Sequence, residues 1–125
     1  MEIFAEILHG DCLEQLKQMP DNYVDLIVTS PPYADQRKTT YGGVSVNHYV
    51  EWFIKLFTKE EDIVLDPFMG SGTTNFVAQR MHRNSIGIEI KSEYYEQVKE
   101  QLRECELMLF EKQTQKNQNK YTTCY

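Results

Sequence analysis

The stretch DPFMGSGTT, residues 66–74, decides the fold of this chain. It follows a short apolar run at residues 63–65 and precedes a helical pattern at residues 75–81. A strand, a glycine loop and a helix in this order receive nucleotide-like ligands at the carboxyl end of the strand. Gly70 and Gly72 permit positive φ angles, and the loop amides with the helix N-terminus favour a carboxylate or phosphate. The stretch therefore predicts a cofactor site, although an ordinary glycine-rich turn is the alternative.

A second stretch, TSPPY at residues 29–33, follows another apolar run, VDLIV at residues 24–28. The run predicts a buried strand, and the two prolines after it end the ladder and fix an extended backbone. Ser30 and the ring of Tyr33 would then be held at the tip of the strand. A planar base with an exocyclic amino group needs oxygen acceptors and an aromatic face, which this tip supplies. By itself, a proline-terminated strand is the alternative.

Together the two stretches resemble the motifs of the amino-directed DNA methyltransferases that use S-adenosylmethionine (SAM). That family pairs a (D/N/S)PP(Y/F/W) catalytic motif with a DPFxGSGTT cofactor motif, and both stand here nearly letter for letter. The catalytic motif comes first, which resembles the permuted, β-type group of cytosine-N4 and some adenine-N6 enzymes. The resemblance implies SAM as cofactor, DNA as partner and a place in a restriction-modification system. Cytosine N4 is preferred as the target, with adenine N6 next.

The resemblance also implies roles for individual residues. The catalytic set would orient the amino group of an extruded base, and it comprises Ser30, Pro31, Pro32 and Tyr33. The cofactor set would hold SAM, and it comprises Asp11, Asp66, Pro67, Phe68, Gly70, Ser71, Gly72, Thr73 and Glu89. The methyl group would pass directly to the amino nitrogen, so that catalysis is mostly positioning and electrostatics and no metal is expected.

Two acidic residues of the cofactor set have alternative interpretations. Asp11 follows the first strand pattern, where the family places an acidic residue for the adenine amino group, but an aspartate there is also a common helix cap. Glu89 closes a strand about twenty residues beyond the glycine loop, where an acidic side chain binds ribose hydroxyls in dinucleotide folds. A surface glutamate is the other interpretation of Glu89.

The composition is that of one small globular domain. The chain has 125 residues, of which 41% are hydrophobic and 26% charged. A net charge of -6 argues against a large basic surface for nucleic acid, so DNA binding by this chain alone is weakly supported. Cys12, Cys105 and Cys124 form no zinc pattern. With no apolar run of membrane length, the sequence predicts a cytoplasmic protein with no membrane contact.

The expected fold is α/β, a reduced Rossmann-like SAM-methyltransferase sheet of about four mainly parallel strands with flanking helices. Strands are predicted at residues 3–8, 24–28, 63–66 and 86–90. In the family's sheet these lie side by side as first, fourth, third and second. Residues 1–112 would form the single domain and residues 113–125 a frayed polar tail. In a helix at residues 48–57, an aromatic stripe is predicted to be core, with lining of the cofactor pocket as the alternative; it comprises Tyr49, Trp52, Phe53, Leu56 and Phe57.

The chain departs from the family in size. Relatives carry a long segment, with the remaining strands and the target-recognition region, between the two motifs, whereas only residues 34–65 lie there in this chain. We therefore expect an internally deleted methyltransferase joined near Glu51. The strand before the catalytic motif would then be an exposed edge, which favours a homodimer or a complementing chain. A non-catalytic SAM-binding remnant and an RNA methyltransferase remain the alternative functions.

Overall fold

The computed structural model describes residues 3–29 and 46–122. The predicted catalytic set, residues 30–33, lies outside the described residues, so its placement stays a prediction. In chain order the elements are β1 (Ala5–His9), α1 (Cys12–Lys17), β2 (Leu26–Ile27), α2 (Val46–Phe57), β3 (Ile63–Asp66), α3 (Thr73–Arg80), β4 (Asn84–Glu89) and α4 (Ser92–Thr122).

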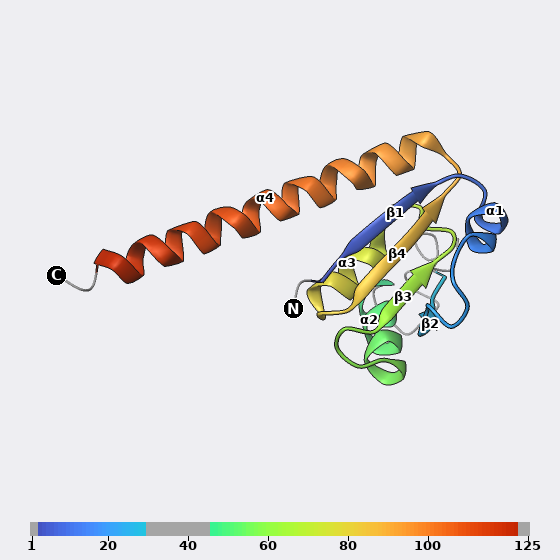
Figure 1. Cartoon of the computed structure of the whole chain (residues 1–125), viewed down its shortest axis with the longest axis horizontal. Helices are drawn as coiled ribbons and strands as arrows, with labels where there is room; N and C mark the ends of the chain where they lie inside the picture. The colour runs from blue at the N-terminus through green and yellow to red at the C-terminus, as the bar shows by residue number, and fades with distance from the viewer. Residues whose placement is uncertain (1–2, 30–45, 123–125) are drawn as a thin grey trace.

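The described strands form one parallel sheet in the order β1-β4-β3-β2 (Figure 1). This confirms the predicted α/β class and the predicted order of the strands. Ile7 pairs with Gly87, Leu65 with Ile86 and Leu26 with Val64. Because all neighbours are parallel, the carboxyl ends of β1, β3 and β4 lie along one edge of the sheet.

Side chains alternate between the two faces of the sheet, and each face has its own core. One face packs against α2 and α3 through Val64, Val77 and Ala78, and against α4 through Val98. The opposite face buries Leu65 and Ile86 beside α1 and the loop that follows it. The site edge is therefore supported from both sides of the sheet.

The aromatic stripe of α2 is not core, which corrects that prediction. Val50 and Ile54 are fully buried against the sheet, whereas Trp52, Leu56 and Phe57 are each 58% exposed. Aromatic and aliphatic residues both recur with helical spacing in α2, so two adjacent faces show the same periodicity. The branched aliphatic pair occupies the inner face, because there it packs against Val64 of β3 and against Val28, which directly follows β2.

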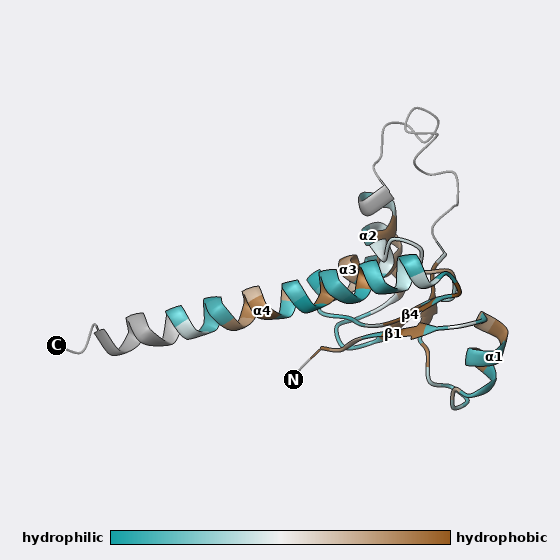
Figure 2. Cartoon of the chain, turned by 90° about the horizontal axis from the view of Figure 1, so that it is seen from above, coloured by the Kyte–Doolittle hydropathy of each residue, from teal (hydrophilic) through white to brown (hydrophobic). Residues whose placement is uncertain are grey.

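The last helix is longer than predicted. Residues 113–122, expected as a frayed tail, are helical and continue α4 beyond the body of the domain (Figure 1). Residues 92–122 contain no proline or glycine, and the glutamate, glutamine and lysine residues of this stretch favour a helix. Val98 and Leu102 pack on the domain, whereas four consecutive apolar residues further along are more than half exposed; they are Leu107, Met108, Leu109 and Phe110. Figure 2 shows hydrophobic bands on the part of α4 that extends beyond the sheet.

Among the described helices, none combines the length and the apolar character that a membrane crossing requires.

Candidate functional site

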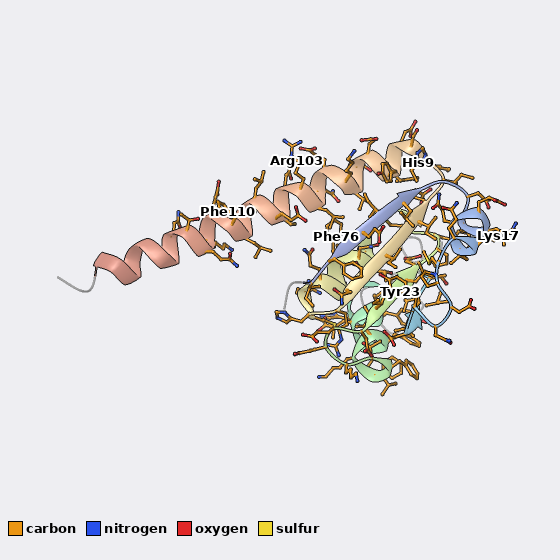
Figure 3. All side chains as sticks on the ribbon, viewed as in Figure 1. His9, Lys17, Tyr23, Phe76, Arg103 and Phe110 are labelled. Atoms are coloured by element: carbon orange, nitrogen blue, oxygen red, sulfur yellow. The ribbon has the colours of Figure 1, made fainter. Side chains whose placement is uncertain are left out.

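The glycine loop lies between the carboxyl ends of β3 and β4. It leaves β3 at Asp66 and enters α3 at Thr73, and β4 ends beside it at Glu89. β1 ends at His9 on the same edge, because His9 pairs with Glu89. His9 also stacks on Tyr95 of α4, with ring centroids 5.1 Å apart, and its place at the end of β1 is visible in Figure 3. The predicted cofactor residues of three separate segments therefore meet at one edge.

Most amides of the loop are already engaged within the protein. The amide of Phe68 donates to Asp66 Oδ1 at 3.0 Å, and the amide of Met69 donates to the Ile88 carbonyl at 2.8 Å. The amide of Gly70 donates to Glu89 Oε2 at 2.8 Å, and that of Gly72 to the Met69 carbonyl at 3.0 Å. These bonds fix the course of the loop along the end of β4.

Both glycines of the loop have the left-handed conformation that the sequence suggested. Gly70 has φ +55° and Gly72 has φ +81°. A Cβ added at Gly70 would meet open space, with its nearest neighbour 4.0 Å away. A Cβ added at Gly72 would lie 3.0 Å from Cγ1 of Val98 and 3.1 Å from the ring of Phe76. Gly72 thus brings the loop close to α4, whereas Gly70 leaves space beside the loop.

The N-terminus of α3 provides free donors. Its N-cap is Gly72, which has no side chain to cap the helix. Within the described residues, the amides of Ser71, Thr73 and Thr74 make no hydrogen bond. Unpaired amides and the helix dipole together favour an anion, so this end of α3 suits a carboxylate or phosphate.

Asp66 is the most deeply buried acid of the site. Its side chain is 1% exposed, and its Oδ2 atom has no hydrogen-bond partner among the described residues. Burial raises the pKa of the Asp66 carboxyl above its ordinary value of 3.8, and the neighbouring Glu89 carboxylate adds to that increase. The Thr74 hydroxyl and the Phe68 amide oppose the increase in the pKa. Because the Asp66 carboxyl is buried, it acts on the loop from within the protein, through its bond to the Phe68 amide.

Glu89 is a buried glutamate rather than a residue of the open surface. It is 8% exposed, and its two oxygens accept from two backbone amides, those of Gly70 and Lys91. Each carboxylate oxygen has a second lone pair, so these bonds leave capacity for a ligand. Glu89 ends β4, as the strand pattern indicated, whereas its contact with the Gly70 amide was not predicted.

Asp11 is the N-cap of α1. Its Oδ1 atom accepts from the amides of Leu13 at 3.0 Å and Glu14 at 3.3 Å. The capping interpretation is therefore correct, and the second oxygen leaves the ligand interpretation open.

The remaining predicted cofactor residues lie in or beside the loop. Phe68 is 66% exposed, and Ser71 and Thr73 place their hydroxyl oxygens 3.4 Å apart. The sequence assigned no role to Thr74, whose buried hydroxyl lies close enough to the Asp66 carboxyl to oppose the increase in its pKa. The motif itself contains Thr74, so that residue could have been included. No group of three potential metal ligands occurs in the described part of the chain.

Comparisons with known proteins match the same region. A family model described as DNA methylase matches residues 49–100. The Type II methyltransferase M.HpaI of Haemophilus parainfluenzae is 54% identical over 52 residues, which are 42% of this chain and 17% of that protein. M2.LlaDCHI of Lactococcus lactis subsp. cremoris, also a Type II methyltransferase, is 39% identical over 87 residues, which are 69% of this chain and 31% of that protein. The match thus spans less than a third of either relative.

Solved structures show the same fold. The crystal structure of M1.HpyAVI is similar with a TM-score of 0.63 and 24% identity, covering 80% of this chain and 99% of that chain. The crystal structure of the M1.HpyAVI-SAM complex gives a TM-score of 0.61 and 20% identity, covering 78% of this chain and 98% of that chain. At these identities the likeness concerns the fold alone.

Proposed function

We propose that the carboxyl edge of the sheet binds SAM, from the premise that a DNA methylase family model matches residues 49–100 of this chain. The observation that carries this proposal is the set of amides at the start of α3 that have no partner among the described residues. A carboxylate complements these amides and the helix dipole. The amino-acid end of SAM carries such a carboxylate.

Two further acids suit the nucleoside end of SAM. Glu89 retains acceptor capacity for ribose hydroxyls at the end of β4. Asp11 follows β1, and its second carboxylate oxygen has no partner among the described residues. Glu89 ends β4, and Asp11 follows the end of the neighbouring strand β1, whose last residue, His9, pairs with Glu89. Their separation along one edge agrees with an extended ligand that crosses the ends of β3, β4 and β1.

We propose that the reaction is transfer of a methyl group to an exocyclic amino group of a base in DNA, with cytosine N4 preferred and adenine N6 next. SAM, when bound, supplies an electrophilic methyl group on a sulfonium. The chain's own part would be to present the amino group, through Ser30, Pro31, Pro32 and Tyr33. Thr29 directly precedes this set, and the amide of Val28 donates to the Leu65 carbonyl at 2.9 Å. The motif therefore follows the strand adjacent to β3.

Binding and transfer are tested separately. Calorimetric titration with SAM should give saturable binding that Glu89→Ala weakens, with Glu93→Ala in the first turn of α4 as a matched surface control. Transfer is measured with labelled SAM on duplex DNA and on RNA, and Ser30→Ala should abolish it while leaving SAM binding intact. A folded chain that does not bind SAM would refute the cofactor assignment. Transfer to RNA but not to DNA would move the proposal to the RNA alternative.

The second candidate function is that of a SAM-binding chain that is active only with a partner. The exposed edge strand of the described sheet favours this candidate. β2 is an edge strand with only two residues in its ladder, and Ile27 is 61% exposed. Exposed edges pair readily with another chain, which here would be a second copy or a complementing chain. The match to only 17% and 31% of two relatives agrees with an internal deletion. Methyl transfer that appears only when a complementing chain is added would support this candidate.

A further inference from the structure

The carboxylate of Glu89 joins the glycine loop to the end of β4. Oε2 accepts from the amide of Gly70 at 2.8 Å, and Oε1 accepts from the amide of Lys91 at 2.9 Å. Nineteen positions separate Gly70 from Glu89 in the sequence, so the first bond is a tertiary contact and not part of a local turn. Bonds from amides to a carboxylate are stronger than bonds between neutral groups, especially where water is excluded, as it is around this 8% exposed side chain.

This contact determines which loop amides remain available. The bond to Glu89 turns the amide of Gly70 toward β4, and the amide of Met69 is held by the Ile88 carbonyl. The loop then continues in the left-handed conformation at Gly70, and the amides of Ser71 and Thr73 are left without partners in the described structure. Without an acceptor for Gly70, a glycine at this position would sample several conformations.

We propose that Glu89 is a positioning residue that fixes the glycine loop in its ligand-ready conformation before any ligand binds. The inference deepens the proposed function, on which it rests for the identity of the ligand. It assigns Glu89 an action on the loop that is separate from any contact with a ribose. A loop held in advance loses less conformational entropy when a ligand binds, so Glu89 strengthens binding even of ligands that it does not touch.

The ligand-free protein tests the inference directly. Amide hydrogen exchange of the full chain is followed by NMR, and Gly70 should exchange about tenfold or more slowly than Ser71, whose amide has no partner. In Glu89→Ala the amides of Gly70 and Lys91 should both exchange faster by about tenfold or more, while Met69 stays protected by Ile88. Glu93→Ala is the matched control and should change none of these rates. Equal exchange of Gly70 and Ser71 in the wild type would overturn the inference without any variant.

Ligands that differ only in the ribose test the consequence for binding. S-adenosylhomocysteine and its 2′,3′-dideoxy form are titrated into the wild type and into Glu89→Gln, which keeps the shape of the side chain but presents an NH₂ group to one of the two amides. A pure ribose contact predicts that the variant loses no affinity for the dideoxy ligand. The positioning role predicts a residual loss of about fivefold or more for that ligand. Absence of that residual loss would overturn the inference.

The two experiments distinguish failure of the inference from failure of the proposed function. If neither nucleoside binds to the wild type, the proposed function fails, while the exchange rates of Gly70 and Lys91 still decide whether Glu89 holds the loop.

Discussion

Replacement of Gly72 by alanine should destabilise the fold through two separable effects. Gly72 has φ +81°, so any side chain there is strained. The added Cβ would also lie 3.0 Å from Cγ1 of Val98, which is fully buried between α4 and the sheet. Gly70→Ala is the matched control, because Gly70 has φ +55° but its Cβ would meet no atom closer than 4.0 Å.

The expected magnitudes follow from these contacts. Alanine in the left-handed region costs about 1–2 kcal/mol at either glycine. Crowding against a packed core adds about 1–3 kcal/mol at Gly72 only. Gly72→Ala should therefore lower the free energy of unfolding by about 2–5 kcal/mol, and Gly70→Ala by about 1–2 kcal/mol. For a domain whose total stability is about 5–15 kcal/mol, the first change is large.

Urea denaturation, followed by far-UV circular dichroism, measures the free energies. A double-mutant cycle with Val98→Ala, which removes the methyl groups nearest the new Cβ, should show a favourable coupling of about 1 kcal/mol or more. Equal losses of stability for the two glycine variants, or an additive double mutant, would refute the reasoning that close packing against α4 requires a glycine at position 72.

Three other changes test separate features. Burial raises the folded-state pKa of Asp66, so its stabilising contribution is complete below pH 3.8 and is lost as the pH rises through the raised pKa. Asp66→Asn should therefore gain in unfolding free energy relative to the wild type as the pH rises above 3.8, and a constant difference across a pH series of urea denaturations would contradict this. Asp11→Ser keeps an N-cap, so the unfolding free energy should change by less than about 0.5 kcal/mol, whereas SAM affinity measured by calorimetry should fall only if the carboxylate binds the ligand. Removal of residues 113–125 should reduce the helical circular dichroism signal. The unfolding free energy should change by less than about 0.5 kcal/mol, because Leu109 and Phe110, just before the removed segment, are already exposed. A larger change would show that the end of α4 packs on the domain.

The sequence contained enough to predict the sheet but not the burial of each helix. Asp66 and Glu89 close apolar runs, and the family resemblance supplied the strand order that the structure confirms. In α2, by contrast, Val50 and Trp52 belong to apolar faces with the same period, and only the position of the sheet decides that Val50 is inside. The exposed aromatic face thus could not be inferred from periodicity.

In the site, too, features that depend on local sequence were predictable, whereas contacts between distant segments were not. Glycines with positive φ at Gly70 and Gly72, and the cap at Asp11, are local features, and local patterns predicted them. The bond between the Gly70 amide and Glu89 joins two elements, and nothing in either segment alone indicates it. The unpaired oxygen of Asp66 likewise results from what surrounds β3.

The position of β2 at the edge of the described sheet should affect cofactor binding and methyl transfer differently. The proposed cofactor site is built by the ends of β1, β3 and β4, and both neighbours of β4 are present. Among the described strands, β2 pairs only with β3. Further bonds between the two segments come from the amides of Val28 and Asp25 and from the Ile63 amide, which donates to the Asp25 side chain at 2.8 Å. Catalytic side chains must be held to within a fraction of an ångström by packing around them, so the residues after β2 need support on the outer side of that strand as well. SAM binding should therefore require only this chain, whereas methyl transfer should depend on what covers β2.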